Sequence, residues 1–257
     1  MSFLDALLLG ILQGLTEFLP VSSSGHLVLA QALLGVKEPG VSFELLVHLG
    51  TLLAVFVYFR ERIGQLILSV FRSEMKAERR IFGFLVIGTI PAGLAGVFLK
   101  DFFEDSFSSP ILTSVMLIVT GLILLSTKLV KPSDKPMTLL STVIMGIGQA
   151  AAIMPGISRS GSTISVGLLL GVKPEKAAEF SFLLAIPAIL GAVVLKADEL
   201  MALDSSLALQ YLVGAVAAFV FGWLAVAILL RIIRRGKFAG FAYYCFAAGA
   251  FGLYLFQ

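Results

Sequence analysis

Charged residues and cysteine are both scarce in this sequence. Only 14% of its 257 residues are Asp, Glu, Lys or Arg, whereas 58% are hydrophobic; soluble domains carry roughly 25% charged residues. A soluble chain of this length could not bury so much apolar surface, so we expect an integral membrane protein with several crossings. The single cysteine, Cys245, excludes a disulfide framework and a cysteine-based metal site.

Six apolar runs are long enough to cross a bilayer, which takes roughly 20 residues. They lie at about 41–59, 81–99, 111–130, 177–196, 208–230 and 239–256. Backbone groups in the hydrocarbon core must pair within helices or a closed barrel, and continuous apolar runs without period-2 alternation favour helices. The expected fold class is therefore an all-α integral membrane protein with six transmembrane helices.

Two further apolar regions, 2–35 and 138–172, are interrupted by turn-forming residues. Residues 20–25 break the first region, and residues 155–161 break the second. The apolar arms that follow these breaks are too short to span a bilayer. Non-helical backbone at membrane depth is tolerated only inside protein or beside a wet cavity. Both regions are therefore expected to be re-entrant helical hairpins whose tips lie inside the protein.

The two interrupted regions also resemble each other in sequence. Residues 10–36 and 146–172 align without gaps, and the identities include polar and glycine positions. The identical pairs are Gly10/Gly146, Ile11/Ile147, Gln13/Gln149, Ser22/Ser158, Ser24/Ser160, Gly25/Gly161, Leu33/Leu169, Leu34/Leu170, Gly35/Gly171 and Val36/Val172. Each hairpin precedes three crossings, and because this number is odd the two halves must lie in the membrane in opposite orientations. The halves, at about 1–130 and 138–257, are therefore expected to form an inverted-topology repeat. Together they make a single membrane domain, 1–257. Interrupted segments at corresponding positions indicate a binding site near the midplane.

The basic residues indicate how the protein is oriented in the membrane, and they do not indicate a nucleic-acid partner. The formal net charge is only +3, and the basic residues gather in alternate loops. These loops are 60–80, 128–137, 173–176 and 231–237. Loops rich in Lys and Arg stay on the cytoplasmic side of a membrane. With six crossings, both termini are then expected on the outer side.

Polar residues begin just before the first break. Gln13 and Glu17 are four residues apart and so share a helix face. Pro20 disfavours helical backbone at the residue before it and is expected to end this arm. The first arm therefore presents an amide and a carboxylate close to its end.

The break itself holds hydroxyl groups next to an imidazole. Its residues are Ser22, Ser23, Ser24 and Gly25. Either Ser23 or Ser24 is expected to cap the arm that follows, and a helix N-terminus with free amides binds anions. His26 would lie in the first turn of that arm, close enough to exchange a proton with a bound anion.

The second break carries Arg159 at the position that corresponds to Ser23. A guanidinium at membrane depth needs an anionic partner, and its planar fork suits phosphate oxygens. Further donors lie around it, namely Ser158, Ser160, Gly161 and Thr163. Together the two breaks offer an acid, a cation, an imidazole and several hydroxyls, which suits phosphoryl transfer on a lipid-borne substrate.

Simpler interpretations of the same residues stay open. Serine and glycine in membrane helices often serve close helix packing. Glu17 and Arg159 could form a buried structural ion pair, and His26 could be an interior histidine. Glu44 is a candidate for a supporting role, whereas His48 is more typical of an interior or interfacial position.

In its polar motifs the sequence resembles the bacterial undecaprenyl-diphosphate phosphatase family linked to bacitracin resistance. The first motif is Gln13-x-x-x-Glu17-Phe-Leu-Pro-Val-Ser-Ser-Ser-Gly-His26, and the second is Pro155-Gly-Ile-Ser-Arg-Ser-Gly-x-Thr163. Supporting matches are Phe43-Glu44 with Leu49-Gly50, and the run Glu179-Phe-Ser-Phe-Leu-Leu184. The resemblance extends over the whole chain.

This resemblance implies a Mg²⁺- or Ca²⁺-assisted enzyme of the bacterial inner membrane that removes the terminal phosphate of undecaprenyl diphosphate. Its product, undecaprenyl phosphate, carries precursors of peptidoglycan and other envelope polymers. The expected partners are therefore a polyprenyl diphosphate and the lipid bilayer, with an active site that opens outward. A homodimer is among the assemblies that the sequence allows.

The resemblance also assigns roles to individual residues. It implies essential catalytic roles for Glu17, Ser23, His26 and Arg159, with Glu17 as the metal ligand. The expected substrate-binding residues are Gln13, Ser22, Ser24, Gly25, Ser158, Ser160, Gly161 and Thr163. Some members of the family have glutamate where this chain has Gln13, so a metal site that needs two carboxylates is in doubt.

Two mechanisms of phosphate removal fit these residues, and so does one rival function. In the first mechanism Ser23 attacks phosphorus and His26 moves the proton, which gives a phosphoserine. In the second, a water activated by the metal or by His26 attacks, and Ser23 only binds. The rival function is a transporter or flippase for a lipid-linked phosphate or another anionic substrate, because inverted repeats with discontinuous helices are a common transporter plan.

Overall fold

The structure is a computed structural model that describes residues 1–34, 41–131, 133–198 and 205–257. Every regular element in these ranges is a helix, so the all-α expectation is confirmed. The described residues do not include Gly35 and Val36, which end the first segment of the repeat alignment. Residue 35 is also the last residue of the first interrupted region. The α-helices are α1 (Phe3–Phe18), α2 (Ser23–Leu34), α3 (Val41–Tyr58), α4 (Arg60–Phe71), α5 (Lys76–Phe98), α6 (Lys100–Phe107), α7 (Pro110–Ser126), α8 (Leu139–Ala151), α9 (Arg159–Leu169), α10 (Pro174–Leu195), α12 (Ala208–Arg234) and α13 (Phe241–Phe256).

Five described segments are long and apolar enough to cross a membrane by themselves. They are Lys76–Phe98, Pro110–Leu129, Pro174–Leu195, Ala208–Arg234 and Phe238–Phe256. The run expected to cross at 41–59 forms α3, and α4 follows it after a bend of 80°, so this bent pair is a sixth candidate. Arg60 and Arg62 at the start of α4 explain the bend, since charged side chains are costly in the hydrocarbon core. The described residues therefore include five candidate crossings, or six with the bent pair.

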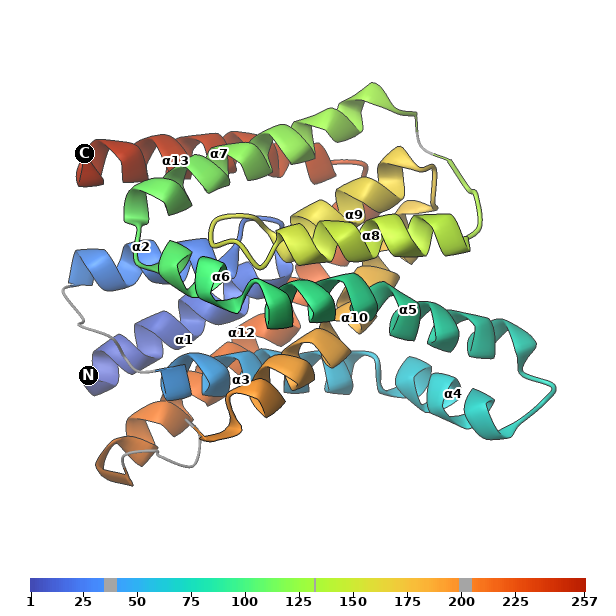
Figure 1. Ribbon diagram of the computed structural model, residues 1–257, viewed down its shortest axis with the longest axis horizontal. Helices are drawn as coiled ribbons and strands as arrows, with labels where there is room; N and C mark the ends of the chain where they lie inside the picture. The colour runs from blue at the N-terminus through green and yellow to red at the C-terminus, as the bar shows by residue number, and fades with distance from the viewer. Residues whose placement is uncertain (35–40, 132, 199–204) are drawn as a thin grey trace.

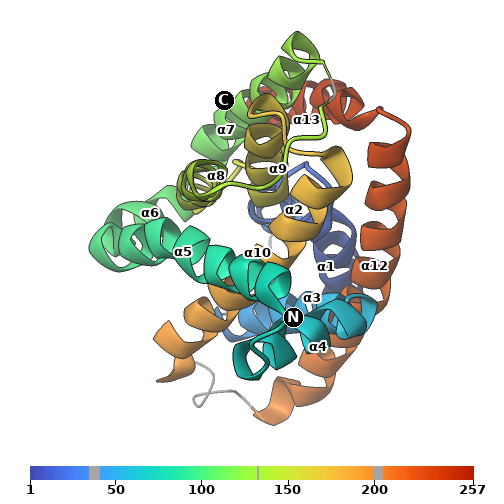
Figure 2. The same cartoon turned by 90° about the vertical axis from the view of Figure 1, so that its right-hand side faces the viewer.

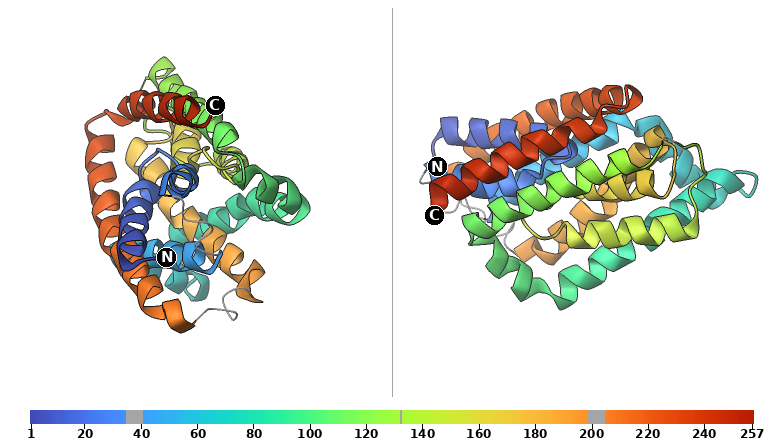
Figure 3. Two further views of the ribbon diagram at one scale, coloured as in Figure 1. Left: turned by 90° about the vertical axis from the view of Figure 1, so that its left-hand side faces the viewer. Right: turned by 90° about the horizontal axis from the view of Figure 1, so that it is seen from above.

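The basic connections gather at one end of the molecule. Figure 1 shows most helices running along the longest axis, with the α4–α5 turn, the α7–α8 linker and the α9–α10 turn at one end. Both chain termini lie at the opposite end (Figures 1 and 3). The segments rich in Lys and Arg at 60–80, 128–131, 133–137 and 173–176 therefore share one end, as the charge pattern indicated, although 60–80 is mostly helical (α4 and the start of α5) rather than a loop.

The helices that follow the two breaks lie inside the bundle. Seen along the longest axis, α2, α9 and α10 are central, and α5, α12 and α13 lie around them (Figure 2). The end of α1 is anchored by Phe18, which is fully buried and contacts the ring of Phe182 in α10 edge-on, with 5.6 Å between ring centroids. The first break is thus fixed against the centre of the bundle.

Two glycines that the repeat alignment pairs make close backbone contacts between helices. Gly10 in α1 lies against the backbone of Gly214 in α12, and Gly146 in α8 lies against that of Gly88 in α5. In both places a Cβ would overlap the neighbouring carbonyl oxygen. Small residues let membrane helices approach closely enough for van der Waals packing to stabilise them. Each interrupted region is therefore held by a long helix from the other half of the chain.

Substituting Gly10 tests this packing. Gly10→Ala should lower the midpoint of thermal unfolding in detergent, because an added methyl group in a tight contact costs about 1–3 kcal/mol. The control is Gly83→Ala in α5, where a Cβ would meet open space; its midpoint should stay the same or rise, since alanine favours helix. Equal midpoints for the two variants would contradict the α1–α12 contact.

Candidate active site

The first break is short and is capped by Ser22. Leu19 takes an extended conformation before Pro20, so α1 ends at Phe18. The side chain of Ser22 accepts a hydrogen bond of 3.2 Å from the backbone N–H of Gly25, which is the N-cap contact for α2. The expectation that Ser23 or Ser24 caps this arm is therefore wrong, because α2 already begins at Ser23. The hydroxyl of Ser23 is thereby free for another partner.

The second break repeats this capping arrangement. Ser158 is the N-cap of α9, and its hydroxyl accepts a hydrogen bond of 3.0 Å from the backbone N–H of Gly161. Ser22 and Ser24 have their hydroxyl oxygens 3.3 Å apart, and Ser158 and Ser160 show the same separation. The four serines that the alignment pairs thus have matching local roles at the starts of α2 and α9.

The two breaks also touch each other. A Cβ on Gly25 would lie only 2.9 Å from the Cα of Gly156, so only a hydrogen atom fits there. The hydroxyl of Ser160 donates to the carbonyl of Leu19, at 3.1 Å. These contacts bring together two segments that are more than half the chain apart, and they place the starts of α2 and α9 at one locus.

A buried ion pair joins the two breaks at this locus. Arg159 Nη2 donates to Glu17 Oε1 at 2.7 Å, and the two side chains are only 14% and 6% exposed. The other carboxylate oxygen, Oε2, accepts from Ser23 Oγ at 2.6 Å and from Gln13 Nε2 at 3.0 Å. Four residues singled out from the sequence therefore form one hydrogen-bonded network.

Thr163 and Ser181 support this network from behind. Arg159 Nη1 donates to the carbonyl of Ser181 at 3.2 Å. The hydroxyl of Thr163 lies 2.6 Å from that of Ser181 and donates to the carbonyl of Arg159 at 2.7 Å. Thr163, which the sequence placed among the substrate-binding residues, is therefore hydrogen-bonded to the residue whose carbonyl holds the Arg159 side chain. Ser181 was not expected, although it lies within the run 179–184 that matched the family.

His26 lies outside the Glu17 network. Its Nδ1 donates to the carbonyl of Ser22 at 2.8 Å, and its Nε2 lies 2.7 Å from the hydroxyl of Tyr244 in α13. The hydroxyl of Ser23, which His26 was expected to deprotonate in one mechanism, donates to Glu17 instead. Glu17 is thus the base in direct contact with Ser23. Tyr244 had no signal in the sequence, because α13 is rich in aromatic residues throughout.

The other histidine lies closer to the network than expected. His48 Nε2 is 3.7 Å from Glu17 Oε2, and its Nδ1 donates to the carbonyl of Glu44 at 2.7 Å. The carboxylate of Glu44 in turn accepts from Gln31 Nε2 at 3.0 Å, which ties α3 to α2. The contact of Glu44 is compatible with the supporting role for which the sequence made it a candidate. For His48 the sequence predicted only an interior or interfacial position. The signal was its spacing, one helical turn after Glu44.

The network offers oxygen ligands that fit a hard divalent cation, though not a complete cage. Among the described residues, no group of three or more His, Cys, Asp or Glu side chains could hold a metal ion. Glu17 is a carboxylate, and the Oε1 atom of Gln13 beside it is buried and has no hydrogen-bond partner among the described residues. Mg²⁺ commonly binds through one or two protein oxygens together with substrate phosphates and water. Gln13 and Glu17 are the residues that fit such a role.

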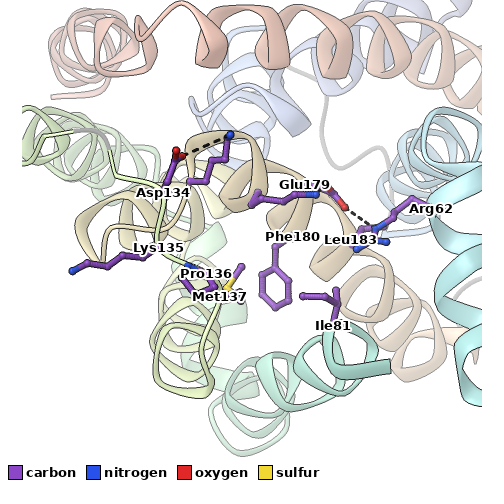
Figure 4. Close-up of a pocket in the computed structure, with 11 residues that line it drawn as sticks. Arg62, Ile81, Asp134, Lys135, Pro136, Met137, Glu179, Phe180 and Leu183 are labelled. Atoms are coloured by element: carbon purple, nitrogen blue, oxygen red, sulfur yellow. Dashed lines mark hydrogen bonds and ion pairs between the residues drawn. The ribbon is translucent and has the colours of Figure 1, made fainter. Parts of the chain in front are cut away.

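A cavity of about 260 Å³ lies on another side of α10, but its residues do not belong to this network. Its apolar lining includes Phe180 and Met137, and most of its charged groups are paired, among them Asp134 with Lys173 and Glu179 with Arg62 (Figure 4). Glu179 accepts from Arg62 at 2.8 Å and from Lys176 at 3.0 Å. Because the Arg62–Glu179 pair joins α4 to α10, we assign it a structural role at the basic end of the bundle.

Comparison with known proteins places this geometry in context. A family model described as bacitracin resistance protein BacA matches residues 6–251. The chain is 47% identical over 255 residues to an undecaprenyl-diphosphatase of Syntrophotalea carbinolica, with 97% of each chain covered. It is 41% identical to an undecaprenyl-diphosphatase of Salinibacter ruber over an aligned length of 270 residues, and the alignment covers 99% of this chain and 100% of the relative. It is 39% identical to undecaprenyl-diphosphatase 1 of Shouchella clausii, also over 270 residues, with 100% and 97% covered. The similarity therefore extends well beyond the two polar motifs.

Neutralising Glu17 tests whether the ion pair stabilises the fold. Glu17→Gln leaves the Arg159 guanidinium buried without a counter-charge, a change that costs about 3–5 kcal/mol, so the thermal midpoint in detergent should fall markedly. The double variant Glu17→Gln/Arg159→Met should recover part of the loss, because no uncompensated charge is left. Glu61→Gln is the control, since that side chain is 85% exposed. Similar midpoints for Glu17→Gln and Glu61→Gln would rule out a stabilising pair.

Proposed function

The chain belongs to the bacitracin resistance protein BacA family, and on that basis we propose that it hydrolyses undecaprenyl diphosphate to undecaprenyl phosphate and inorganic phosphate. The reaction recycles the lipid carrier for cell-wall synthesis. The observation that carries the proposal is the contact of Arg159 with Glu17 and of Glu17 with Ser23 at the starts of two helices. A cation, a base and a nucleophile are the groups that phosphoryl transfer requires.

The proposed substrate position follows from the locus where the two breaks meet. The polyprenyl tail stays between helices in lipid, and the diphosphate lies at the N-termini of α2 and α9. Free backbone N–H groups and the helix dipole favour an anion there. The hydroxyls of Ser22, Ser24, Ser158 and Ser160 lie in the same first turns. Gly25 and Gly161 would contribute through the backbone, because a Cβ on either would meet Gly156 or Ser158 rather than open space.

Arg159 would exchange one anionic partner for another during binding. Its guanidinium pairs with Glu17 in the structure. A phosphate group offers two oxygens and therefore a stronger, bidentate contact. When Arg159 turns to the phosphate, Glu17 Oε1 loses its charged partner and the carboxylate becomes a better base. Substrate binding would therefore activate the group that already accepts the hydrogen bond from Ser23.

In the first mechanism Ser23 Oγ forms a bond to the terminal phosphorus, and the bond from that phosphorus to the bridging oxygen breaks. The Ser23 proton goes to Glu17, and undecaprenyl phosphate leaves with the bridging oxygen. Water then attacks the phosphoserine and gives its proton to His26, the Ser23–phosphorus bond breaks, and Ser23 regains a proton from Glu17. In the second mechanism the water attacks the diphosphate directly, and Ser23 only binds. The 2.6 Å Ser23–Glu17 contact supports the first.

A divalent cation, Mg²⁺ or Ca²⁺, would supply further positive charge for the phosphoryl oxygens when it is bound. Glu17 and Gln13 would hold it together with the substrate phosphates. The neutral amide of Gln13 leaves Glu17 as the single carboxylate of this set. The affinity for metal should therefore depend on the presence of the diphosphate.

We also propose the finer topology, with six crossings and two re-entrant hairpins in an inverted repeat. Matching serine caps at the starts of α2 and α9 support the repeat. The basic loops at one end and the termini at the other support an orientation with both termini on the outer side (Figure 1). The active site would then open outward from the bacterial inner membrane. The homodimer stays a prediction.

Phosphate release in detergent tests the function. Purified protein with Mg²⁺ or Ca²⁺ should release phosphate from undecaprenyl diphosphate, and excess chelator should stop the release until metal is restored. Glu17→Ala and His26→Ala should each lower the rate about 100-fold or more, the range for a positioned acid or base. Glu61→Ala, an exposed glutamate, serves as the control. No release by the wild-type protein with either metal would reject the phosphatase and favour a transporter.

Trapping labelled phosphate on the protein distinguishes the two mechanisms. With a label on the terminal phosphate and acid quenching within one turnover, the wild-type protein should retain label as phosphoserine. Ser23→Ala should lose both the label and the activity, whereas Ser73→Ala, an exposed serine, should keep both. Activity retained in Ser23→Ala would favour direct attack by water.

A further inference from the structure

Tyr244 holds the imidazole of His26 from the opposite end of the sequence. The phenol oxygen lies 2.7 Å from His26 Nε2. The two rings are also stacked, with centroids 5.6 Å apart and planes only 10° apart. A hydrogen bond and a stacked ring together fix both the position and the rotation of the imidazole. Tyr244 belongs to α13, which carries none of the residues predicted for the site.

The partners of His26 determine which nitrogen carries a proton. The carbonyl of Ser22 can only accept, so Nδ1 must be protonated at the 2.8 Å contact. His26 is 9% exposed, and none of its hydrogen bonds or ion pairs within the described chain involves a carboxylate. A buried cation without a counter-charge is costly, so the imidazole is neutral and Nε2 bears a lone pair. Tyr244 then donates its hydroxyl proton to Nε2.

Both nitrogens of His26 are therefore occupied before any proton transfer takes place. The carbonyl of Ser22 has no proton to give and cannot receive one from Nδ1 in a stable form. A proton that enters or leaves His26 has one remaining path, the hydrogen bond to Tyr244. We propose that Tyr244 is the positioning residue of His26 and that it relays the proton between Nε2 and the attacking water; this rests on the proposed phosphatase function.

The relay balances without a charged phenol. As the water oxygen bonds to phosphorus, one O–H bond of the water breaks and its proton goes to the phenol oxygen. In the same step the original phenol O–H bond breaks and that proton goes to Nε2. The products are an imidazolium, whose Nε2–H now donates to Tyr244, and an unchanged phenol. A hydroxyl suits both stages, because it donates to the neutral ring and accepts from the charged one.

Tyr244→Phe is the direct test, because it keeps the stacked ring and removes only the hydroxyl. We expect the kcat for phosphate release to fall about 10- to 100-fold, as for other residues that orient a functional histidine, with KM within about twofold. The matched control is Tyr243→Phe, the same change at the neighbouring residue, whose hydroxyl accepts from Lys128 at 3.1 Å. Tyr243→Phe should keep the wild-type kcat. A wild-type kcat in Tyr244→Phe would overturn the proposal.

A double-variant comparison shows whether Tyr244 acts through His26. In the His26→Ala background, adding Tyr244→Phe should cause no further loss of kcat, because the relay then has no acceptor. Independent losses that multiply would mean that Tyr244 acts separately and would overturn the proposal. Full activity in His26→Ala would overturn it as well, while leaving the phosphatase function intact.

Nitrogen NMR tests the contact without any turnover. The chain has two histidines, so His48→Gln with ¹⁵N-labelled histidine leaves only the His26 signals. In the protein with a wild-type Tyr244 we expect a protonated Nδ1 and an unprotonated Nε2. In Tyr244→Phe the Nε2 resonance should move towards the position of an unprotonated nitrogen without a hydrogen bond. In Tyr243→Phe it should not move. A protonated Nε2, or no shift in Tyr244→Phe, would contradict the assignment. If the wild-type protein releases no phosphate, the proposed function fails and these resonances alone decide the pairing.

Discussion

The ion pair between Glu17 and Arg159 is the interaction on which the interior of this protein depends. Neither charge could stay at this depth alone, because the desolvation of an unpaired ion costs several kcal/mol. Their side chains meet at 2.7 Å only because the two breaks touch and because α2 and α9 both begin at that locus. The serine caps, the Gly25–Gly156 contact and the buried ring of Phe18 all serve this meeting. The pair thus fastens the two halves of the chain together.

The same pair gives the site a balanced charge. Glu17 and Arg159 neutralise each other, and Gln13 adds a donor to the carboxylate without adding charge. The corresponding Gln149 has no acid four residues later, since Ile153 occupies that position, and its side-chain polar atoms have no hydrogen-bond partner within the described chain. The two breaks therefore share their caps but not their other polar groups. The first supplies the carboxylate of Glu17 and the hydroxyl of Ser23, and the second supplies the guanidinium of Arg159.

The sequence predicted the parts of the site that depend on local backbone rules. Pro20 ends α1 because the residue before a proline avoids helical backbone. The contact of Glu17 with Arg159 is not local, and the sequence left it as one open interpretation, since a buried charge needs a partner. The positions that were missed depend on packing between distant helices. Tyr244 lies on an apolar helix whose faces look alike in sequence, so nothing local indicates which face meets the site. The spacing of His48 from Glu44 does not by itself show that this face of α3 lies beside Glu17. The cap on α2 was misassigned by one or two residues, which is the usual uncertainty of a helix boundary.

Ser22 combines two demands that few amino acids can meet. Its φ of 68° lies in the left-handed region, which costs a side-chain-bearing residue roughly 1–2 kcal/mol. Its hydroxyl must also cap α2. Glycine would relieve the backbone but remove the cap, and alanine would do neither. Ser158 makes the same cap with an ordinary φ of −73°, so the two positions, identical in sequence, should differ in the substitutions they tolerate. Mutational drift in this protein should therefore be asymmetric, with Ser22 restricted to residues such as serine or asparagine and Ser158 open to a wider set of capping residues.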